Sequence, residues 1–321
     1  MNRRTLCTAA AMAGIPWVSA LAQSEYPNQV IRLIAPYAPG GTVDILSRAL
    51  AERLQRDLGQ SVIVENRGGA GGTIGADVAS KAKPDGYTVL FGAVHHAIAQ
   101  SVYPKLGYDI RDLTPIGFLG RVNHALIINN ALPAKNVREL VALLKAEPQR
   151  YSYATPGAGT MQHLMAEYFK NATGTQMTHV PYRGSSPAMV DVISGNVALM
   201  FETMPSALQH INAGNVRAIA VTAKARSPHL PQVPTIAESG APNYDATSWY
   251  GLYAPAKTPQ AVVDRLNLAI NNAFKDKAFV ERWVKLGADA GGGTPAELKK
   301  LTVDEVSRWG ELARSAKITI D

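Results

Sequence analysis

The 321-residue sequence predicts an α/β protein with two similar lobes. Short β-branched runs alternate with amphipathic segments of helical spacing, an order typical of α/β folds. One strand–turn–helix unit occurs twice, as IAPYAPGGTVDILSRALAERL and as YATPGAGTMQHLMAEYFK. Each copy would direct a helix N-terminus towards a shared crevice, where free N–H groups and the helix dipole favour an anion. The sequence therefore predicts an anion-binding protein.

The first lobe begins with the strand VIRLIA, a short β-branched run bounded by proline and glycine. A helix is expected over Asp44–Leu58, where apolar residues recur at helical spacing and Gly59 follows as a stop. The strand SVIVEN, the helix TIGADVASKA and the strand YTVLFG come next. This β-α-β-α-β order predicts parallel strands.

The second lobe repeats this order. Helix Val137–Ala146 comes first, and strands YSYAT, MTHVPY, VALMFE and VRAIAVTA then alternate with helices that include Thr160–Asn171 and Ser186–Ser194. The distance from the turn threonine to the next Arg-Gly pair is also similar, 25 positions after Thr42 and 23 after Thr160. Two such halves favour a duplicated architecture, and chance similarity between common α/β units stays the alternative.

A proline-rich segment over Ser227–Pro259 is expected to be extended, which suits a chain that returns to the first lobe. Three helices would then pack on that lobe, over Pro259–Lys275, Phe279–Leu286 and Pro295–Arg314. The two crossings between lobes would form a hinge. We therefore predict that lobe 1 comprises residues 23–123 and 247–321 and that lobe 2 comprises residues 124–246.

The N-terminus predicts export. Arg3 and Arg4 precede an apolar run that ends at Leu21 and is too short for a stable membrane span. Small residues at Ala20 and Ala22 fit a cleavage site, so residues 1–22 are predicted to be a signal peptide and the mature chain is expected in the periplasm. The paired arginines leave both Sec and twin-arginine export open.

Composition excludes several classes of function. Cys7 is the only cysteine and lies in the predicted signal, so the mature chain has no thiol for a disulfide, a zinc site or a nucleophile. The formal charge of +7 falls to +5 without the two signal arginines, and no run of five like charges indicates a nucleic-acid partner. The glycines of GGAGGTIG are one position too widely spaced for a dinucleotide site.

Candidate ligand-binding residues gather in the two glycine turns. Glycines let backbone amides approach an oxygen closely, which applies to Gly40, Gly41, Gly157 and Gly159. The threonines that follow, Thr42 and Thr160, either cap their helices or bond the ligand. Asp44 is open to the same two interpretations, since a carboxylate in the first helical turn is favourable in its own right.

Other candidates surround these turns. His163 lies one turn into the second helix, and Arg183 could hold a carboxylate with its fork of donors, although both have ordinary structural or solvated interpretations. His95 follows the strand YTVLFG at a sheet edge where α/β proteins bind ligands, and Tyr37 offers aromatic surface. Because the adjacent His95 and His96 point apart and no third ligand is spaced suitably, we expect neither a metal nor a cofactor.

Five strings together resemble the Bug family, extracytoplasmic solute-binding proteins related to the receptor of tripartite tricarboxylate transporters. They are APYAPGGTVDILSR, VIVENRGGAGGTIGADVASKAKPDGYTVLFG, YATPGAGTMQHL, THVPYRGSSPAMVDVISGNVALMFE and SWYGLYAP, and they span the mature chain in order. The resemblance implies a type II periplasmic-binding-protein fold, with two lobes, a central cleft and two hinge crossings. It also implies that loops 37–44 and 155–160, the latter including Thr155, hold one ligand carboxylate. Gly68 and Glu202 stand where the family often has proline and aspartate, and Glu202 could change what binds at the far end of the ligand.

The resemblance implies a periplasmic receptor that captures an organic carboxylate and delivers it to inner-membrane transporter subunits. Dicarboxylates, tricarboxylates and aromatic carboxylates all stay open as ligands. We expect a monomer without enzymatic activity. The alternatives are a secreted hydrolase or isomerase that uses His163, Asp44 or Glu202 as acid or base, and a ligand sensor without transport. The expected ligand-binding residues are Tyr37, Gly40, Gly41, Thr42, Asp44, His95, Thr155, Gly157, Gly159, Thr160, His163, Arg183 and Glu202.

Overall fold

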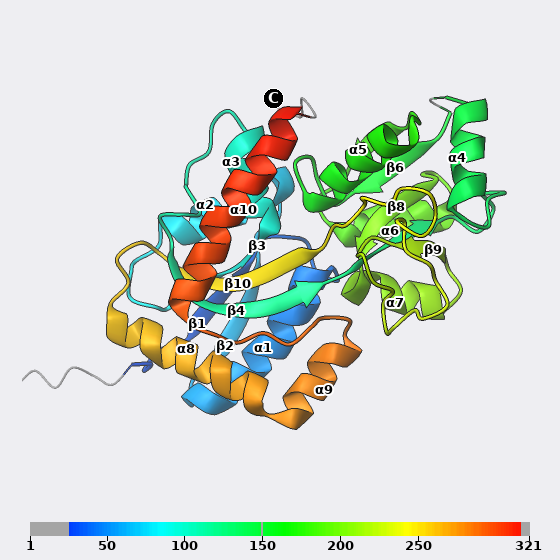
Figure 1. The fold of residues 1–321 in the computed structure, drawn as a ribbon. Helices are drawn as coiled ribbons and strands as arrows, with labels where there is room; N and C mark the ends of the chain where they lie inside the picture. The colour runs from blue at the N-terminus through cyan, green and yellow to red at the C-terminus, as the bar shows by residue number, and fades with distance from the viewer. Residues whose placement is uncertain (1–25, 149, 316–321) are drawn as a thin grey trace, which may run out of the picture.

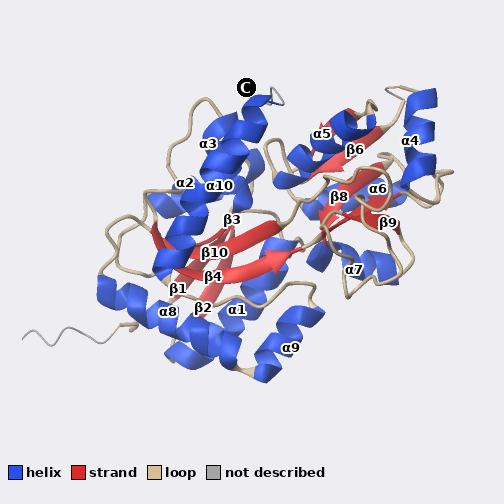
Figure 2. Cartoon of the chain, viewed as in Figure 1, coloured by secondary structure: helices blue, strands red, loops and turns tan. Residues whose placement is uncertain are grey.

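A computed structural model describes residues 26–148 and 150–315, so the predicted signal peptide over residues 1–22 lies outside the described residues. Figure 1 shows two lobes side by side, each built on one β-sheet with helices packed against it. The same view coloured by secondary structure separates the two sheets clearly (Figure 2). The predicted two-lobed α/β architecture is confirmed.

The first lobe contains a five-stranded sheet in the order β2-β1-β3-β10-β4. Its strands are β1 (Ile31–Ala35), β2 (Val62–Asn66), β3 (Thr88–Ala93), β4 (Thr114–Val122) and β10 (Ser248–Ala254). Its helices are α1 (Thr42–Leu58), the 3-10 turn η1 (Ala70–Gly72), α2 (Thr73–Ser80), α3 (Val94–Val102), α8 (Gln260–Lys275), α9 (Lys277–Lys285) and α10 (Pro295–Ser315). Strands β1, β2 and β3 are parallel, as their helical crossovers require.

The second lobe also contains a five-stranded sheet, in the order β7-β6-β8-β5-β9. Its strands are β5 (His124–Ile128), β6 (Ser152–Thr155), β7 (Thr178–Pro181), β8 (Leu199–Thr203) and β9 (Arg217–Val221). Its helices are α4 (Val137–Ala146), α5 (Met161–Thr173), α6 (Ser185–Ser194) and α7 (Met204–Asn212). Strands β7, β6 and β8 are parallel to one another, and β5 runs antiparallel to its two neighbours, β8 and β9.

Both sheets are mixed, so the expectation of parallel strands was only partly right. The returning strand β10 lies inside the first sheet and pairs antiparallel with β3 and β4. Its side chains are all buried, and the indole of Trp249 donates to Glu305 at 3.0 Å. Sequence analysis expected an extended return here but did not expect a central strand.

The chain crosses between the sheets at two neighbouring places. Only Asn123 separates β4 from β5, and the return passes from β9 to β10 through residues 222–247. Ser248 Oγ lies 3.2 Å from His124 Nε2, which links the two crossings directly. In Figure 1 these teal and yellow segments run together between the lobes. Adjacent crossings of this kind form a hinge, because a few residues there can change the angle between two rigid sheets.

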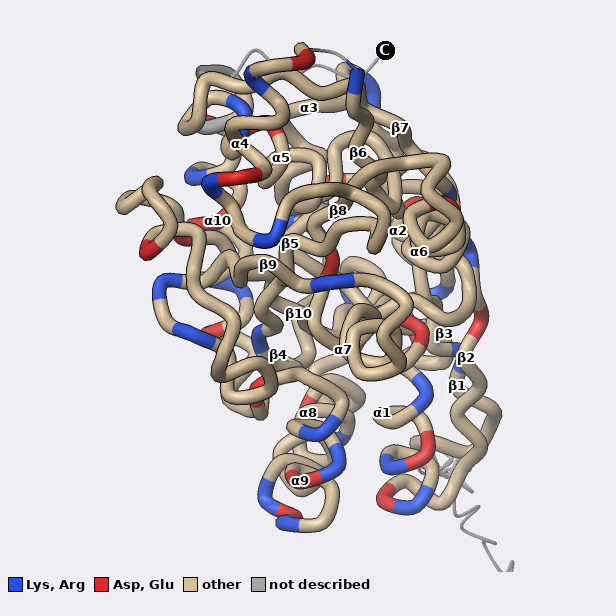
Figure 3. The backbone as a smooth tube through the Cα atoms, turned by 90° about the vertical axis from the view of Figure 1, so that its right-hand side faces the viewer, with Lys and Arg blue, Asp and Glu red and all other residues tan. Residues whose placement is uncertain are grey.

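Figure 3 shows lysine and arginine interspersed with aspartate and glutamate along the tube. Among the described residues, none of the helices combines the length and the hydropathy that a membrane crossing requires. The described part of the chain also contains no group of three histidine, cysteine, aspartate or glutamate side chains arranged to hold a metal ion.

Candidate ligand-binding site

A small cavity of about 30 Å³ lies between the two lobes. Its lining comes from both lobes: Tyr37, Gly41, Thr42, Val43, His95, Pro156, Met161, Gln162, Ser185, Thr203, Ser248 and Tyr250. This volume accommodates only one or two water-sized groups. The lobes therefore meet closely around a polar centre.

Five helices begin at this cavity. The N-cap or first residues of α1, α5, α6 and α7 line it, and so does His95, the second residue of α3. The first amides of a helix have no partner within the helix, and the helix dipole makes that end positive. Among the described residues that line the cavity, none is a lysine or arginine. Its attraction for an anion thus comes from oriented amides, hydroxyls and helix dipoles.

Direct hydrogen bonds hold the lobes together around the cavity. The hydroxyls of Thr42 and Thr203 lie 2.5 Å apart, across the gap between α1 and α7. Ser186 donates to the carbonyl of Pro39 at 2.7 Å, and Tyr103 donates to the carbonyl of Ala158 at 2.9 Å. Each of these bonds joins one lobe to the other, so the structure represents a closed arrangement.

The first glycine turn is held by Asp44. Its carboxylate accepts from the Gly40 amide at 3.0 Å and from Asn66 at 3.1 Å, and it pairs with Arg48 at 2.9 Å. Burial alone would raise the pKa of Asp44, but these hydrogen bonds outweigh it and lower the pKa. Gly40 and Asp44 therefore shape the turn, while Gly41 caps α1 without a side-chain bond and lines the cavity.

In the second glycine turn, two glycine amides donate hydrogen bonds to acceptors of the turn itself. The amides of Gly157 and Gly159 donate to Thr155 Oγ1 at 3.3 Å and to His163 Nδ1 at 3.2 Å. Thr160 caps α5 by accepting from the His163 amide at 3.4 Å, and its hydroxyl donates to the Gly157 carbonyl at 2.8 Å. These five residues form the turn that directs α5 towards the cavity, and the residues of this segment that line the cavity are Pro156, Met161 and Gln162.

His163 lies within the second lobe rather than in the cavity lining. Its ring stacks on His179 with centroids 4.1 Å apart, and His179 stacks in turn on Tyr153 at 4.9 Å. Burial lowers the pKa of His163, so its ring is neutral at pH 7. Arg183 also lies outside the lining, on an exposed position between β7 and α6.

His95 presents an unpartnered nitrogen in the cavity wall. Its ring meets Tyr37 edge-on with centroids 4.8 Å apart, and the Tyr37 hydroxyl donates to the Gly71 carbonyl at 2.8 Å. The Nε2 atom of His95 is buried without a hydrogen-bond partner. Burial and the neighbouring His96 hold the pKa of His95 well below its ordinary value, so the ring is neutral. A buried unpaired nitrogen of this kind is costly unless a bound group satisfies it.

Glu202 lies fully buried directly behind the lining, at the end of β8. Its Oε1 accepts from the Thr203 amide at 2.8 Å and from the Thr203 hydroxyl at 2.5 Å. Its Oε2 has no hydrogen-bond partner, although Ser185 and Gln162 are close enough to affect it. Burial raises the pKa of Glu202 to about 7, although the hydrogen bonds from Thr203 and the nearby side chains of Ser185 and Gln162 favour the ionised form.

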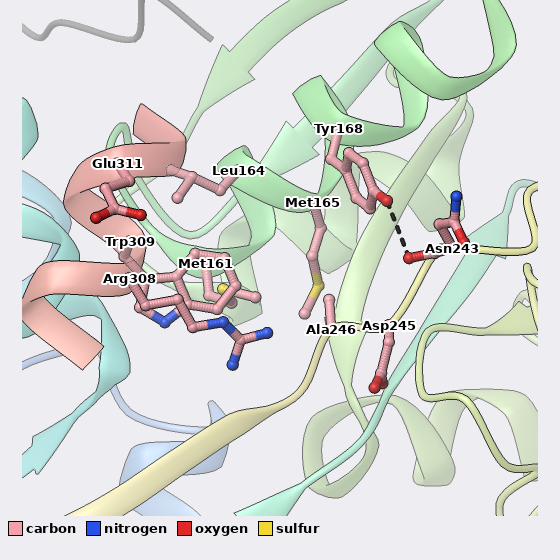
Figure 4. Close-up of a pocket in the computed structure, with 10 residues that line it drawn as sticks. All are labelled: Met161, Leu164, Met165, Tyr168, Asn243, Asp245, Ala246, Arg308, Trp309 and Glu311. Carbon is pink, nitrogen blue, oxygen red and sulfur yellow. Dashed lines mark hydrogen bonds between the residues drawn. The ribbon is translucent and has the colours of Figure 1, made fainter. Parts of the chain in front are cut away.

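A second cavity of about 440 Å³ lies to one side, between α5, residues 243–246 and α10 (Figure 4). Methionine and leucine side chains and Trp309 give it an apolar floor, and Arg308 and Glu311 lie at its edge. Met161 lines both cavities. The buried unpartnered groups and the converging helices belong to the smaller cavity, which is therefore the better candidate for the ligand site.

Of the predicted site residues, the structure brings four into the lining: Tyr37, Gly41, Thr42 and His95. The other nine hold the turns, lie behind the wall or are exposed. Eight lining residues were not named individually from the sequence, although the first two lie in the expected loops 37–44 and 155–160: Val43, Pro156, Met161, Gln162, Ser185, Thr203, Ser248 and Tyr250. Most of these follow the carboxyl end of a strand or begin a helix, which is the signal that could have found them.

Two α/β lobes joined by two crossings, with helix N-termini converging on a cavity between them, define a solute-binding protein. The chain matches the family described as "Tripartite tricarboxylate transporter family receptor" over residues 46–318. It is 39% identical to Protein BugT of Bordetella pertussis (strain Tohama I) over 307 residues, which cover 95% of this chain and 94% of that protein.

Two solved structures from Rhodopseudomonas palustris have the same fold. Rpa4515 with adipate has a TM-score of 0.89 at 35% identity, covering 92% of this chain and 99% of that one. MatC with bound malate has a TM-score of 0.85 at 29% identity, covering 89% of this chain and 99% of that one. The chain belongs to the tripartite tricarboxylate transporter receptor family, the Bug proteins, which are periplasmic binding proteins. The expected type II periplasmic-binding-protein fold is confirmed.

Proposed function

We propose that the protein captures a small organic carboxylate between its lobes in the periplasm and delivers it to the membrane subunits of a tripartite tricarboxylate transporter. The observation that carries this proposal is the convergence of five helix N-termini on one small cavity between the lobes. Oriented amides at helix N-termini bind carboxylates well because they need no counter-charge. Adipate and malate in the two related structures support the same ligand chemistry.

Contact with the ligand is assigned to residues of both lobes. From the first lobe we assign Tyr37, Gly41, Thr42 and His95, and from the second lobe the first residues of α5, α6 and α7. The lobe limits at residues 123/124 and 246/247 are part of the same proposal. They are consistent with strands β1–β4 and β10 in one sheet and β5–β9 in the other.

Closure couples binding to transport. A dicarboxylate is larger than the cavity of about 30 Å³, so it enters only when the lobes separate. The bound ligand then contacts both lobes and stabilises the closed form by its higher affinity for that form. The membrane subunits would recognise this closed form, and the ligand would leave chemically unchanged. A monomer suffices for this mechanism.

A thermal-shift screen of the mature chain, residues 23–321, tests the function. The panel contains adipate, malate, citrate and terephthalate, with adipamide as the uncharged counterpart of adipate. A true ligand at 100 times its Kd should add about 2.7 kcal/mol to the free energy of unfolding and raise the Tm by several degrees. Adipamide should have no effect, because it lacks the charge that the helix dipoles favour.

Calorimetry and mass spectrometry complete the test. Each acid that raises the Tm should bind one per chain, and prolonged incubation should return it with unchanged mass. The proposal is refuted if none of the acids binds, or if the bound acid is converted into a product.

A further inference from the structure

Glu202 is a buried acid without a cationic partner. Its side chain is fully buried, and no lysine or arginine of the described residues is among the groups that affect its charge. An ionised carboxylate in such a place is expensive, since neither water nor a counter-charge stabilises it. The carboxyl group of Glu202 is therefore expected to keep a proton at a higher pH than an ordinary surface glutamate does.

The two oxygens of this carboxyl differ in their surroundings. Oε1 accepts both bonds from Thr203, whereas Oε2 is buried with no partner. A proton on Oε2 would leave both Thr203 bonds intact, and it would turn an unsatisfied acceptor into a donor. The side chain of Glu202 can thus change its charge without rearrangement of its backbone.

A chain of hydroxyls connects this carboxyl to the opposite lobe. The Thr203 hydroxyl donates to Glu202, so at the 2.5 Å contact it is Thr42 that donates to Thr203. Thr42 is the first residue of α1 in the first lobe, and both threonines line the cavity. Glu202 therefore contacts the interface between the lobes through Thr203. It is next in the chain to Thr203, which lines the cavity where we expect the anion to bind.

We propose that Glu202 binds a proton together with the ligand, so that the receptor takes up a dicarboxylate anion and one proton as a pair. The proton comes from solvent and goes to Oε2 of Glu202, and no covalent bond changes. This inference rests on the proposed function and extends it to the protonation of the site. The physical reason is electrostatic, because a ligand carboxylate and an ionised Glu202 would repel each other in a water-poor cavity.

Other titratable groups near Glu202 do not change charge between pH 6.5 and 8. Tyr37 and Tyr250 face it from the first lobe, and burial raises the pKa of both hydroxyls far above this range. His124 lies on the neighbouring strand β5, and burial lowers its pKa to about 3. His95 lines the same cavity and is neutral, and its pKa is well below the ordinary value. The raised pKa of Glu202, about 7, falls within this pH range.

Calorimetry in pairs of buffers with different ionisation enthalpies measures the proton directly. The probe is adipate, or malate if adipate gives no heat. With a pKa of about 7 in the free protein, Glu202 should take up about 0.9 proton per ligand at pH 8 and about 0.2 at pH 6.5. The Kd should rise up to about tenfold from pH 6.5 to pH 8, because binding takes up a proton and the proton concentration is lower at pH 8.

Two variants identify the group that takes up the proton. Glu202→Gln keeps the shape and imitates the protonated acid, so proton uptake should disappear and the Kd at pH 8 should be as tight as that of the wild type at pH 6.5. His95→Gln removes the histidine of the cavity lining, and proton uptake should persist in this variant even if its affinity falls. If Glu202→Gln does not fold, the number of protons that the wild type takes up per ligand at pH 8 tests the proposal by itself.

The outcomes separate this inference from the proposed function. Binding of adipate or malate without proton uptake at pH 8 would overturn the role of Glu202 and leave the receptor function standing. Tight binding of aspartate with no proton uptake would overturn it as well, because an ammonium group would then pair with ionised Glu202. If no organic acid binds at either pH, the proposed function fails and the proton uptake fails with it.

Discussion

Gly71→Ala should weaken ligand binding by blocking closure of the lobes. Gly71 lies in η1 of the first lobe, and a Cβ added there would lie 2.5 Å from the carbonyl oxygen of Ala158 in the second lobe. The same Cβ would lie 2.9 Å from the Tyr103 hydroxyl, which already donates to that oxygen. Ordinary contacts begin near 3.4 Å, so the lobes must move apart locally by most of an ångström.

The expected magnitude follows from the cost of overpacking. Inserting one methyl group into a well-packed interface costs about 1 to 3 kcal/mol, which corresponds to roughly 5- to 150-fold in Kd. The clash with the Ala158 carbonyl, which belongs to the second lobe, exists only in the closed form. The left-handed backbone at Gly71, with φ of 61°, adds about 1 kcal/mol for an alanine in the open and closed forms alike, so this cost lowers stability and leaves affinity unchanged.

Gly59→Ala is the matched control. Gly59 also has a left-handed backbone, with φ of 68°, but its added Cβ would meet nothing within 4 Å. Calorimetry with the acid found in the thermal-shift screen should show weaker binding for Gly71→Ala alone, and denaturant unfolding should show a similar loss of about 1 kcal/mol in both variants. Equal Kd values in the two variants would refute the reasoning that this glycine contact limits closure.

Three further predictions test the site and the hinge. Thr203→Val removes the bond to Thr42 that exists only in the closed form, which should cost about 1 to 3 kcal/mol of binding free energy. Calorimetry should then show a Kd higher by roughly 5- to 150-fold, and an unchanged Kd would contradict this. Arg308→Ala alters the larger cavity, and its Kd should stay within about twofold of the wild type unless the ligand binds there. His124 is buried with a pKa of about 3, below its unfolded value of 6.5, so it contributes stability that is present above pH 6.5 and is lost as the pH falls towards 3. When the pH falls from 7.5 to 4.5, the free energy of unfolding of His124→Gln should decrease by about 3 kcal/mol less than that of the wild type. Urea titrations that show equal decreases in the two proteins would contradict this.

The elements that sequence analysis located best are those with strong local signals. The helix that ends before Gly59 was expected to begin at Asp44 and begins at Thr42, and the glycine turn before α5 was found because strand, turn and helix are adjacent in the chain. Periodicity and turn residues act over a few positions, which a sequence displays directly. Helix α3 and strands β4 and β5 went unassigned, and β10 was expected only as an extended segment because proline-rich flanks resemble a linker.

The prediction of the ligand-binding residues was limited in the same way. Sequence analysis counted the amides of Gly40, Gly157 and Gly159 as ligand donors, and the structure gives each of them an internal acceptor. Whether an amide is free depends on where nearby side chains fold, and spacing alone does not reveal this. Conversely, Thr203 looked unremarkable in the sequence, yet it forms one of the bonds that join the lobes.

By itself, the sequence determined the α/β class, the paired glycine turns and the resemblance to a receptor family, because these depend on local pattern. Only the tertiary structure decided which helix ends meet, that α3, α6 and α7 join α1 and α5 at one cavity, and that Glu202 is buried there without a counter-charge. The reason is physical: burial and hydrogen-bond satisfaction are properties of neighbours in space, and the neighbours that define this site come from segments more than 100 residues apart.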